Sequence, residues 1–535
     1  MEFNNKKSLA FLPVIFALLL ITGIFIGIKL SRNGTNERML LFPRPDKINS
    51  VLDMIEDTYV DSVSRGNLEE EAINSVLKQL DPHSVYIPAS ELQEMNEPLE
   101  GNFSGIGVQF NFQEDTIVIV GTVSGGPSEK VGVLPGDRIV KVNDTIVAGV
   151  KLTSDKIVRR LKGIEGTKVK IAIVRPGIKL PIEFTITRGK IPLKSIDIAY
   201  IASPGIGYLK ISKFAKTSFD EFNKSIVNLN KLGMKKKLII DLRGNGGGLL
   251  NAATDIADQF LDDKELIVYT KGRARQRMDT YSKPSGLCIG FNLVLLIDEY
   301  SASASEILAG ALQDNDRATV IGRRSFGKGL VQEQALLPDG SGIRLTIARY
   351  YTPTGRSIQK PYTNGVDEYY EELDKRIAHG ELEKQDSIHF DDSLRYKTPK
   401  GKIVYGGGGI MPDIFIPFDT SGISNYYQQI SSKGILYRFG FMFSDQNRQV
   451  LKQFKSVGEM VTYLKKKNIF DQFVQYATKN GISATREDLN RSSFWIENQL
   501  MAYVSRNFLD NEGFYPILLK TDSTFLKAVE VLKSK

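Results

Sequence analysis

The spacing of apolar residues changes along the chain, and each change predicts a different kind of structure. Between residues 45 and 100 apolar residues recur every three to four positions, as at Ile48, Val51 and Ile55. That spacing places them on one face of a helix, so we predict an N-terminal helical domain over residues 45–100. The polar residues 32–44 before it are predicted to be a linker.

From Gly101 apolar residues recur at every second position, which is typical of β-strands. Five such runs, with one helical stretch before the fourth, predict a compact β module over residues 101–188. Residues 189–420 alternate apolar strands, such as "KLIIDLRG" and "LVLLIDE", with helices, which predicts an α/β core. A polar insertion, residues 366–399, interrupts this core, and residues 421–535 are helical in pattern. The predicted fold class is therefore multidomain α/β.

The beginning of the chain contains a long apolar stretch. The 21 uncharged residues 8–28 lie between Lys7 and Lys29. As a helix they would extend about 31 Å, which matches the apolar core of a bilayer. The stretch ends in bulky residues, so we predict an uncleaved single-pass transmembrane anchor with a cytoplasmic tip over residues 1–31. A cleaved signal peptide is the alternative.

Composition narrows the class of protein. The chain has 535 residues, of which 41% are hydrophobic and 25% charged, and these values fit several globular domains. Its formal net charge of +8 is small for this length and its basic clusters are short, so no nucleic-acid partner is predicted. Cys288 is the only cysteine, which excludes a disulfide within the chain and a cysteine-based zinc site.

The segment "IGRRSFGKGL" is nearly a phosphate-binding loop. From Gly322 to Lys328 it matches the pattern G-x-x-x-x-G-K, but Gly329 stands where a serine or threonine would hold Mg²⁺. A phosphate-binding loop also opens a long helix, whereas only "LVQEQALL" precedes the turn "PDGSG". Nucleotide binding through residues 322–329 is therefore the less favoured interpretation.

The segment "SASASEILAGAL" directly follows the apolar strand "LVLLIDE". A serine at a strand-to-helix turn exposes its hydroxyl, and the backbone N–H groups that follow point at the group under attack. Ser303 is therefore a candidate nucleophile. Ser303 and Glu306 also match a capping box, which many helices carry without any catalytic role.

A nucleophilic serine needs a base, and histidine is the usual one. The three histidines, His83, His379 and His389, fall on no predicted core strand or adjoining loop. A lysine can replace histidine if burial lowers its pKa from about 10.4 to about 7. Lys328 lies between glycines and close to Phe326, on a turn between apolar strands, so we predict that Lys328 is the general base.

Taken together these segments resemble the C-terminal processing peptidases, or tail-specific proteases, which use a Ser/Lys dyad. The matching segments are "SASASEILAGALQDNDRATVIGRRSFGKGLVQ", "IIDLRGNGGG", "LDPHSVYI" and "DGSGIRLTIARYYTPTGRSIQ". The resemblance implies Ser303 as nucleophile, Lys328 as general base and Gln332 as the residue that orients the lysine. It also implies the backbone N–H groups of Ala304 and Gly248, the latter favoured over Gly247, as oxyanion donors.

The β module looks like a PDZ domain. Such domains bind the free C-terminal carboxylate of a peptide with backbone N–H groups and add the peptide to their sheet as a strand. The resemblance assigns this role to the loop of Ser104, Gly105, Ile106 and Gly107. It also implies that docking of a substrate here completes the catalytic site.

The predicted function is that of a serine endopeptidase anchored in a bacterial inner membrane, with its catalytic domain facing the periplasm. Its predicted substrates are exported proteins with free C-termini, and no metal, nucleotide or other cofactor is implied. A PDZ scaffold with a silent peptidase core is the rival from another class. That rival predicts the loss of Ser303, Lys328 or Gln332, and all three are present. An adaptor protein and a homo-oligomer stay open, as do the roles of the insertion and of the C-terminal region.

Overall fold

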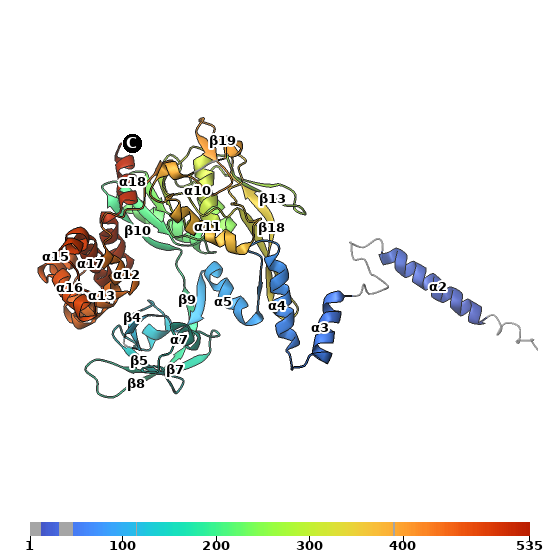
Figure 1. The fold of residues 1–535 in the computed structure, drawn as a ribbon, viewed down its shortest axis with the longest axis horizontal. Helices are drawn as coiled ribbons and strands as arrows, with labels where there is room; N and C mark the ends of the chain where they lie inside the picture. Colours follow the sequence, from blue (N-terminus) through green and yellow to red (C-terminus); the bar gives the residue numbers. More distant parts are fainter. Residues whose placement is uncertain (1–11, 32–45, 114, 389–390, 535) are drawn as a thin grey trace, which may run out of the picture. The chain divides into compact units, whose positions relative to one another are not determined.

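The structure of the chain is a computed structural model that describes residues 12–31, 46–113, 115–388 and 391–534 (Figure 1). The chain divides into two compact units, Met1–Val76 and Leu77–Lys535. The first unit contains the helices α2 (Leu12–Ser31), α3 (Lys47–Thr58) and most of α4 (Arg65–Lys78). Helices α3 and α4 lie where the apolar spacing predicted them.

Helix α3 begins at a side-chain cap. The Asp46 carboxylate accepts hydrogen bonds from the backbone N–H groups of Ile48 and Asn49, which the first turn of a helix leaves unpaired. Arg65, at the start of α4, forms an ion pair with Asp53 of α3. This ion pair lies at the surface, so it adds little to stability.

The predicted anchor occupies residues 8–28. Residues 8–11 lie outside the described part of the chain, and the rest of the stretch falls in α2. Among the residues that the structure describes, no helix has both the length and the apolar character that crossing a membrane requires. The anchor therefore has no support from the structure.

The β module forms an antiparallel sheet in the order β3-β4-β5-β7-β8, with β6 paired to β5. Its strands are β3 (Val108–Gln113), β4 (Thr116–Thr122), β5 (Arg138–Val142), β6 (Thr145–Ile146), β7 (Lys168–Val174) and β8 (Ile182–Thr187), and its helices are α6 (Pro127–Lys130) and α7 (Ser154–Leu161). Alternate residues of β7, Val169, Ile171 and Ile173, pack in one core with Ile157 of α7. The five predicted strands and the predicted helix are all confirmed. A pair that the pattern did not predict, β2 (Asn102–Gly105) with β9 (Gly189–Pro192), joins the two ends of the module.

A six-stranded sheet forms the centre of the α/β core. Its strands, in spatial order, are β10 (Ile196–Ser203), β11 (Ile206–Ile211), β12 (Lys237–Asp241), β15 (Asn292–Ile297), β16 (Thr319–Gly322) and β21 (Ile414–Phe415). Helices α8 (Ser218–Lys231), α9 (Leu250–Asp258), α10 (Ala304–Asp314) and α18 (Ser523–Ser534) cover it. Leu238 and Ile240 of β12 pack in the hydrophobic cluster that contains α8, α9 and α10, whereas Ile239 between them packs in the cluster with α18. The sheet is thus covered on both faces, which confirms the predicted α/β core.

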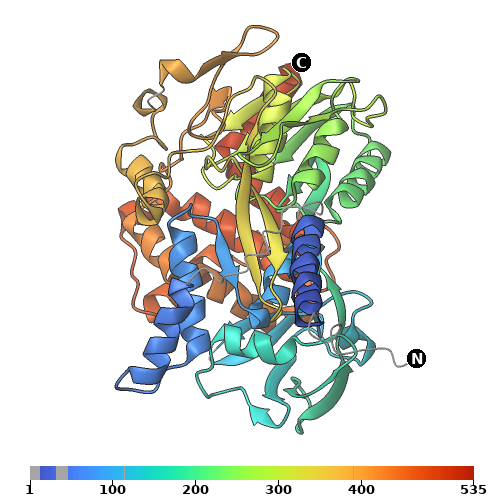
Figure 2. The same cartoon turned by 90° about the vertical axis from the view of Figure 1, so that its right-hand side faces the viewer.

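A second sheet joins strands from distant parts of the chain. They are β1 (Val85–Ile87), β13 (Leu266–Lys271), β14 (Met278–Tyr281), β17 (Leu330–Leu336) and β18 (Gly342–Tyr351). Strand β18 is antiparallel to β1, β13 and β17, and Figure 2 shows blue β1 beside yellow β18. Because β17 directly follows the loop that contains Lys328, no helix opens there. The loop therefore lacks the helix N-terminus on which phosphate binding depends.

The predicted insertion is built from short elements. They are α11 (Val366–Ala378), the 3-10 helices η1 (Gln385–Ser387) and η2 (Asp392–Leu394), and β19 (Arg395–Lys397), which pairs with β20 (Ile403–Tyr405). A further helix, α5 (Ala89–Glu100), lies between β1 and the β module in the sequence.

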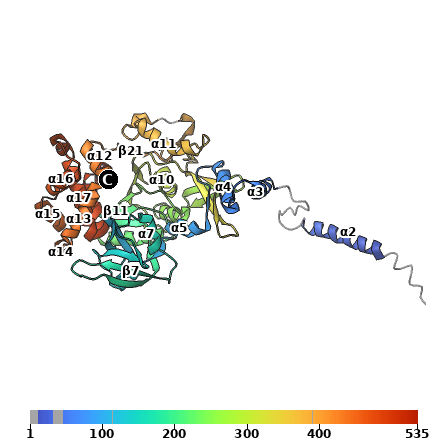
Figure 3. The ribbon, with the colours of Figure 1, turned by 60° about the horizontal axis from the view of Figure 1, so that its bottom comes forward.

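The C-terminal region is helical, as predicted. Its helices are α12 (Asn425–Ser432), α13 (Ile435–Gln446), α14 (Arg448–Leu451), α15 (Val457–Lys466), α16 (Ile469–Lys479) and α17 (Arg486–Leu518), followed by η3 (Leu519–Thr521) and α18. Helices α12 to α17 gather around a hydrophobic core of their own (Figure 3). In α18, Phe525, Ala528 and Leu532 pack instead on the six-stranded sheet. The chain therefore returns to the α/β core at its end.

Candidate active site

The turn between β15 and α10 holds Ser303 in an unusual backbone conformation. Ser303 is the residue that caps α10, with φ 56° and ψ −113°, which residues other than glycine rarely adopt. The neighbouring backbone is held by Asn245: its carbonyl oxygen accepts hydrogen bonds from the Ala302 N–H (3.0 Å) and the Ser305 hydroxyl (2.9 Å). Such strain persists only where the surroundings fix it, and it is common at functional sites.

The glycine loop after β12 lies directly against Ser303. A Cβ atom added to Gly247 would come within 2.8 Å of the Ser303 Cβ, so only glycine fits there. The Gly247 N–H donates to the Asn245 side chain (2.8 Å), whereas the Gly248 and Ala304 N–H groups have no hydrogen-bond acceptor among the described residues. The structure thus leaves two amides of this region available, those of Gly248 and Ala304, and occupies that of Gly247.

Glu306 and Tyr350 tie Ser303 to Lys328. The buried Glu306 carboxylate accepts from the Ser303 N–H (2.8 Å) and the Lys328 N–H (2.9 Å). It also accepts from the Gly327 N–H (2.7 Å) and the Ser325 hydroxyl (2.5 Å). The Tyr350 hydroxyl lies 3.1 Å from Ser303 O and 2.7 Å from Lys328 O. Two buried side chains therefore fix the backbones of Ser303 and Lys328 at the same place.

Burial and hydrogen bonding act in opposite directions on Glu306. All four of its donors favour the charged carboxylate, whereas desolvation favours the neutral acid. Desolvation is the larger effect and raises the pKa of Glu306 to about 7. The sequence predicted only a helix-capping role for Glu306, because the residues of the lysine loop that it contacts lie about 20 positions later in the chain.

The Lys328 amine is partly buried, and desolvation lowers its pKa below the ordinary value of 10.5. The positive charge of Arg344 lowers the pKa further, against the opposing effects of Asp81 and Glu306. The amine donates a hydrogen bond to Gln332 Oε1 (3.1 Å). In the described part of the chain no hydrogen bond joins the amine to the Ser303 hydroxyl.

The turn "LDPHS", residues 80–84, lies next to this lysine. Gln332 Nε2 donates to His83 O, so the turn holds the amide that contacts Lys328. The turn is fixed in its own right, because Asp81 accepts hydrogen bonds from the N–H groups of His83 and Ser84.

The prediction that His83 lies away from the core strands is wrong. His83 precedes β1, which joins the second sheet through β18. Desolvation and the nearby Lys328 charge lower the pKa of His83 to about 4, so its ring is neutral at neutral pH. Only the pairing of β1 with β18, a strand more than 250 residues later in the chain, brings His83 next to Lys328.

A cleft of about 960 Å³ opens beside Gln332. Apolar side chains contribute much of its wall, and Leu249 follows Gly248 in the glycine loop. The larger apolar lining residues are Phe219, Leu249, Leu250, Met278, Val331 and Ile347. Through Leu249, the wall of this cleft lies next in the chain to Gly248.

The loop predicted to bind peptide tails lies in the β module. Ser104 and Gly105 pair with β9, and Gly107 has φ +72°, a conformation suited to glycine. The N–H groups of Ile106 and Gly107 have no acceptor among the described residues. The loop leads into β3, whose outer side is an edge of the module's sheet. The module therefore offers both free amides and an open strand edge.

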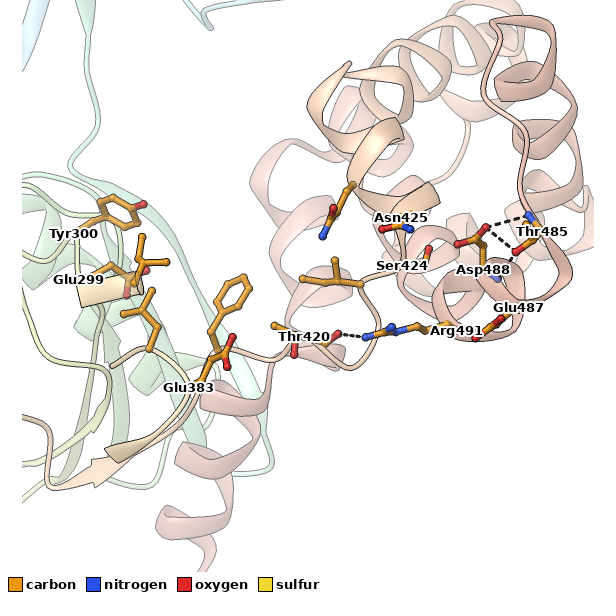
Figure 4. A pocket seen from close by; sticks show the side chains of 15 residues that line it. Glu299, Tyr300, Glu383, Thr420, Ser424, Asn425, Thr485, Glu487, Asp488 and Arg491 are labelled. Atoms are coloured by element: carbon orange, nitrogen blue, oxygen red, sulfur yellow. Dashed lines mark hydrogen bonds between the residues drawn. The ribbon is translucent and has the colours of Figure 1, made fainter. Parts of the chain in front are cut away.

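A second cavity, of about 930 Å³, lies between the α/β core and the C-terminal helices. Figure 4 shows Tyr300 and Glu299 on the core side and Asp488 and Arg491 on the helical side. Three of its charged groups are already paired with protein: Asp488 accepts from Thr485, Arg491 donates to backbone carbonyls, and Glu299 pairs with Arg323. It presents no arrangement of nucleophile and base.

Comparisons with known proteins agree with this geometry. Family models match residues 205–370 (peptidase family S41), 104–186 (PDZ domain) and 426–510 (family of unknown function DUF8443). A carboxy-terminal-processing protease of Bartonella bacilliformis is 35% identical over 347 residues, 63% of this chain and 79% of the relative. The chain belongs to the carboxy-terminal processing proteases.

Two further proteins are similar to this processing protease. A carboxy-terminal processing protease of Bacillus subtilis is 34% identical over 321 residues, 59% of this chain and 65% of the relative. A solved photosystem II D1 C-terminal processing protease is 24% identical and covers 69% of this chain and 92% of its own, with a TM-score of 0.36. The predictions of the family, of a PDZ domain and of a serine peptidase are confirmed.

Replacing Glu306 of this processing protease with glutamine is expected to lower kcat/KM by about 100-fold. The new NH₂ group would face N–H and O–H donors, and leaving buried donors unpaired costs about 1–3 kcal/mol of the free energy of unfolding. Steady-state kinetics and urea unfolding measure the two effects. The matched control is Glu530→Gln on the exposed side of α18. Wild-type kinetics in Glu306→Gln would show that its carboxylate does not hold the site.

Proposed function

We propose that this protein is an endopeptidase in which Ser303 is the nucleophile and Lys328 the general base. The observation that carries the proposal is the shared anchoring of the two residues by Glu306 and Tyr350, with the lysine amine in a partly desolvated place. A lysine needs such a place in order to lose its proton near neutral pH.

The proposed reaction begins with transfer of the Ser303 hydroxyl proton to the neutral Lys328 amine while the oxygen attacks the peptide carbonyl. The carbonyl carbon becomes tetrahedral, and its oxyanion accepts hydrogen bonds from the N–H groups of Ala304 and Gly248. As the C–N bond breaks, Lys328 returns the proton to the leaving amine. Water then hydrolyses the acyl-enzyme by the same proton path, which regenerates Ser303.

Gln332 has the role of orienting the amine in this proposal. In the structure the amine donates to Gln332 rather than to Ser303. Catalytic hydrogen bonds are often long in an enzyme without substrate and shorten when substrate binds. We propose that substrate docking brings the amine onto the Ser303 hydroxyl.

We further propose that the PDZ domain selects substrates by their free C-terminal carboxylate. The support is the pair of free N–H groups at Ile106 and Gly107 next to the open edge of β3. A polypeptide held there by its end would present an internal bond to the cleft beside Gly248.

Amidation of a substrate's C-terminus is expected to lower kcat/KM by about tenfold or more, because the charged carboxylate then no longer meets the two N–H groups. The test incubates wild type with an unfolded protein that ends in a free or an amidated carboxyl group, at matched concentrations. A short peptide that spans only the cleft serves as control, since its cleavage should not depend on the end group. Equal rates for the two forms of the long substrate would remove the carboxylate-reading role.

The site of action that we propose is the periplasmic side of a bacterial inner membrane, with exported proteins as substrates. The basis is the apolar sequence of residues 8–28 alone. Fractionation of cells and protease protection of spheroplasts test it, and recovery of the full-length protein in the cytoplasmic fraction would contradict it.

A further inference from the structure

The insertion helix α11 contacts the backbone of the loop that carries Lys328. Arg376 is 4% exposed, and its guanidinium donates to Arg324 O (2.8 Å) and Ser325 O (3.1 Å). Glu381, just beyond α11, pairs with both Arg376 and Arg324. The helix therefore binds two consecutive carbonyls, three and four residues before the catalytic lysine.

Aromatic side chains extend this contact. The Tyr369 ring of α11, 2% exposed, packs edge-on against Phe326 of the loop. The Lys360 ammonium lies 4.1 Å from the centre of the Phe326 ring and 4.3 Å from that of Tyr369, and it pairs with Glu372 of α11. The positive charge of Lys360 is attracted to both aromatic rings, and this attraction is stronger where water is excluded.

Tyr369 also reaches the other neighbour of the lysine. Its hydroxyl lies 2.9 Å from His83 Nε2, in the turn whose carbonyl accepts from Gln332. One residue of the insertion thus contacts the loop of Lys328 through Phe326 and the support of Gln332 through His83.

The remaining sides of the loop are closed by the core. Glu306 accepts from the loop's N–H groups, the Lys360 N–H donates to Gly327 O (3.0 Å), and the Ile410 N–H donates to the Ser325 hydroxyl (2.6 Å). Together, α11 and these core groups surround the backbone of residues 324–328. Without α11, two buried carbonyls and the outer face of Phe326 would meet water.

We propose that residues 366–381 are a brace that positions Lys328 and keeps water from its amine, with Arg376 and Tyr369 as positioning residues. The proposal rests on the proposed role of Lys328 as general base. Within this segment, Tyr369 lies among the residues matched by the peptidase family model, whereas residues 371–381, with Arg376, lie beyond them.

The brace has a consequence for pH dependence. If water enters when α11 is loosened, the ammonium form of Lys328 is better solvated, and a higher pH is needed to form the neutral base. The groups that face the amine are Arg344 on β18, Asp81 and His83 in the turn before β1, Glu306 on α10 and Gln332 on β17. None of these charges is altered by changing Arg376 or Tyr369.

The test compares the pH profiles of kcat/KM, between pH 6 and 10, for wild type, Arg376→Met, Arg376→Lys and Tyr369→Phe. Arg376→Met is expected to move the rise of the profile upward by about one pH unit, so that activity at pH 7 falls by about tenfold and recovers near pH 10. Arg376→Lys, which can reach one carbonyl, is expected to shift less. Tyr369→Phe, which keeps the ring and loses only the hydroxyl contacts with His83 and Gln359, is expected to shift least. Lys375→Met, on the exposed side of the same helix, is the matched control and should not shift.

A brace without influence on Lys328 would give a different result. Weakening it would lower Tm and would lower kcat/KM by the same factor at every pH. The midpoint of the pH profile would then stay unchanged, and this result would overturn the proposal. If Arg376→Met does not fold, Arg376→Lys and Tyr369→Phe decide in the same way. Cleavage by Ser303→Ala would instead refute the catalytic assignment itself, so the two failures are distinguishable.

Discussion

Replacing Ser303 with alanine is expected to abolish measurable peptide cleavage, lowering kcat/KM by about 10⁴-fold or more. Without the hydroxyl no acyl-enzyme forms, and only binding and oxyanion stabilisation remain. The PDZ domain is untouched by the substitution. Binding of a fluorescent tail peptide, measured by anisotropy, is therefore expected to keep its wild-type Kd while cleavage disappears.

Neighbouring serines provide controls for this assignment. The hydroxyls of Ser301 and Ser305 are buried and donate to the backbone carbonyls of Leu242 and Asn245. Ser301→Ala and Ser305→Ala are expected to cleave at least about 100-fold faster than Ser303→Ala, because each keeps the nucleophile. A Ser303→Ala protein that cleaves as fast as either control would refute Ser303 as nucleophile.

Replacing Lys328 with alanine is expected to lower kcat/KM by about 10³-fold to 10⁴-fold, because Ser303 then has no positioned base. Lys328→Arg is expected to fail as severely, since a guanidinium keeps its proton at any pH that the protein tolerates. Both variants should retain tail binding, and Lys328→Ala should keep the wild-type thermal stability or exceed it, because it no longer buries an amine. Kinetics, anisotropy and calorimetry measure the three properties.

Chemical rescue makes the Lys328 prediction more specific. The space left in Lys328→Ala can admit a small primary amine, so methylamine is expected to restore part of the activity at high pH. The matched comparison is Ser303→Ala, which no amine can rescue. Nucleotide binding by wild type, lost in Lys328→Ala, would favour the phosphate-loop interpretation instead.

Apolar spacing was enough to predict the principal strands of the PDZ domain and of the central sheet. The runs from residue 101 to 188 became the five principal strands of the PDZ domain, and the strands "KLIIDLRG" and "LVLLIDE" became neighbours in the central sheet. These patterns succeed because alternate residues of each strand pack into hydrophobic clusters. The pairing of β2 with β9 was missed because neither short strand alternates.

The site could be predicted only as far as single motifs allowed. Ser303 and Lys328 stand out through their local sequence, but their supports come from elsewhere in the chain. Asn245 acts through backbone contacts, and His83 arrives through a strand pairing of high sequence separation. Tyr350 was not singled out, because nothing near it in sequence shows that its hydroxyl contacts Ser303 and Lys328. Their roles depend on tertiary packing, which apolar spacing does not encode.

The role of the insertion, residues 366–399, could not be predicted from the sequence either. Its polar composition predicted only an interruption of the α/β core, and its role stayed open among assembly, partner binding and a lid. In the structure Arg376 and Tyr369 are buried against the loop of Lys328, although their neighbours on α11 are largely exposed. Two buried residues among many charged ones leave too weak a signal to predict a brace.

The central claim is that the neutral amine of Lys328 activates the hydroxyl of Ser303. Its most direct test is the rate at which a fluorophosphonate labels Ser303, measured from pH 6 to 10 in wild type and in Lys328→Ala. We expect the wild-type rate to rise through an ionisation with a pKa below 10.5 that belongs to Lys328, and this rise to be absent from Lys328→Ala. Equal labelling of the two proteins, with the same dependence on pH, would contradict the account.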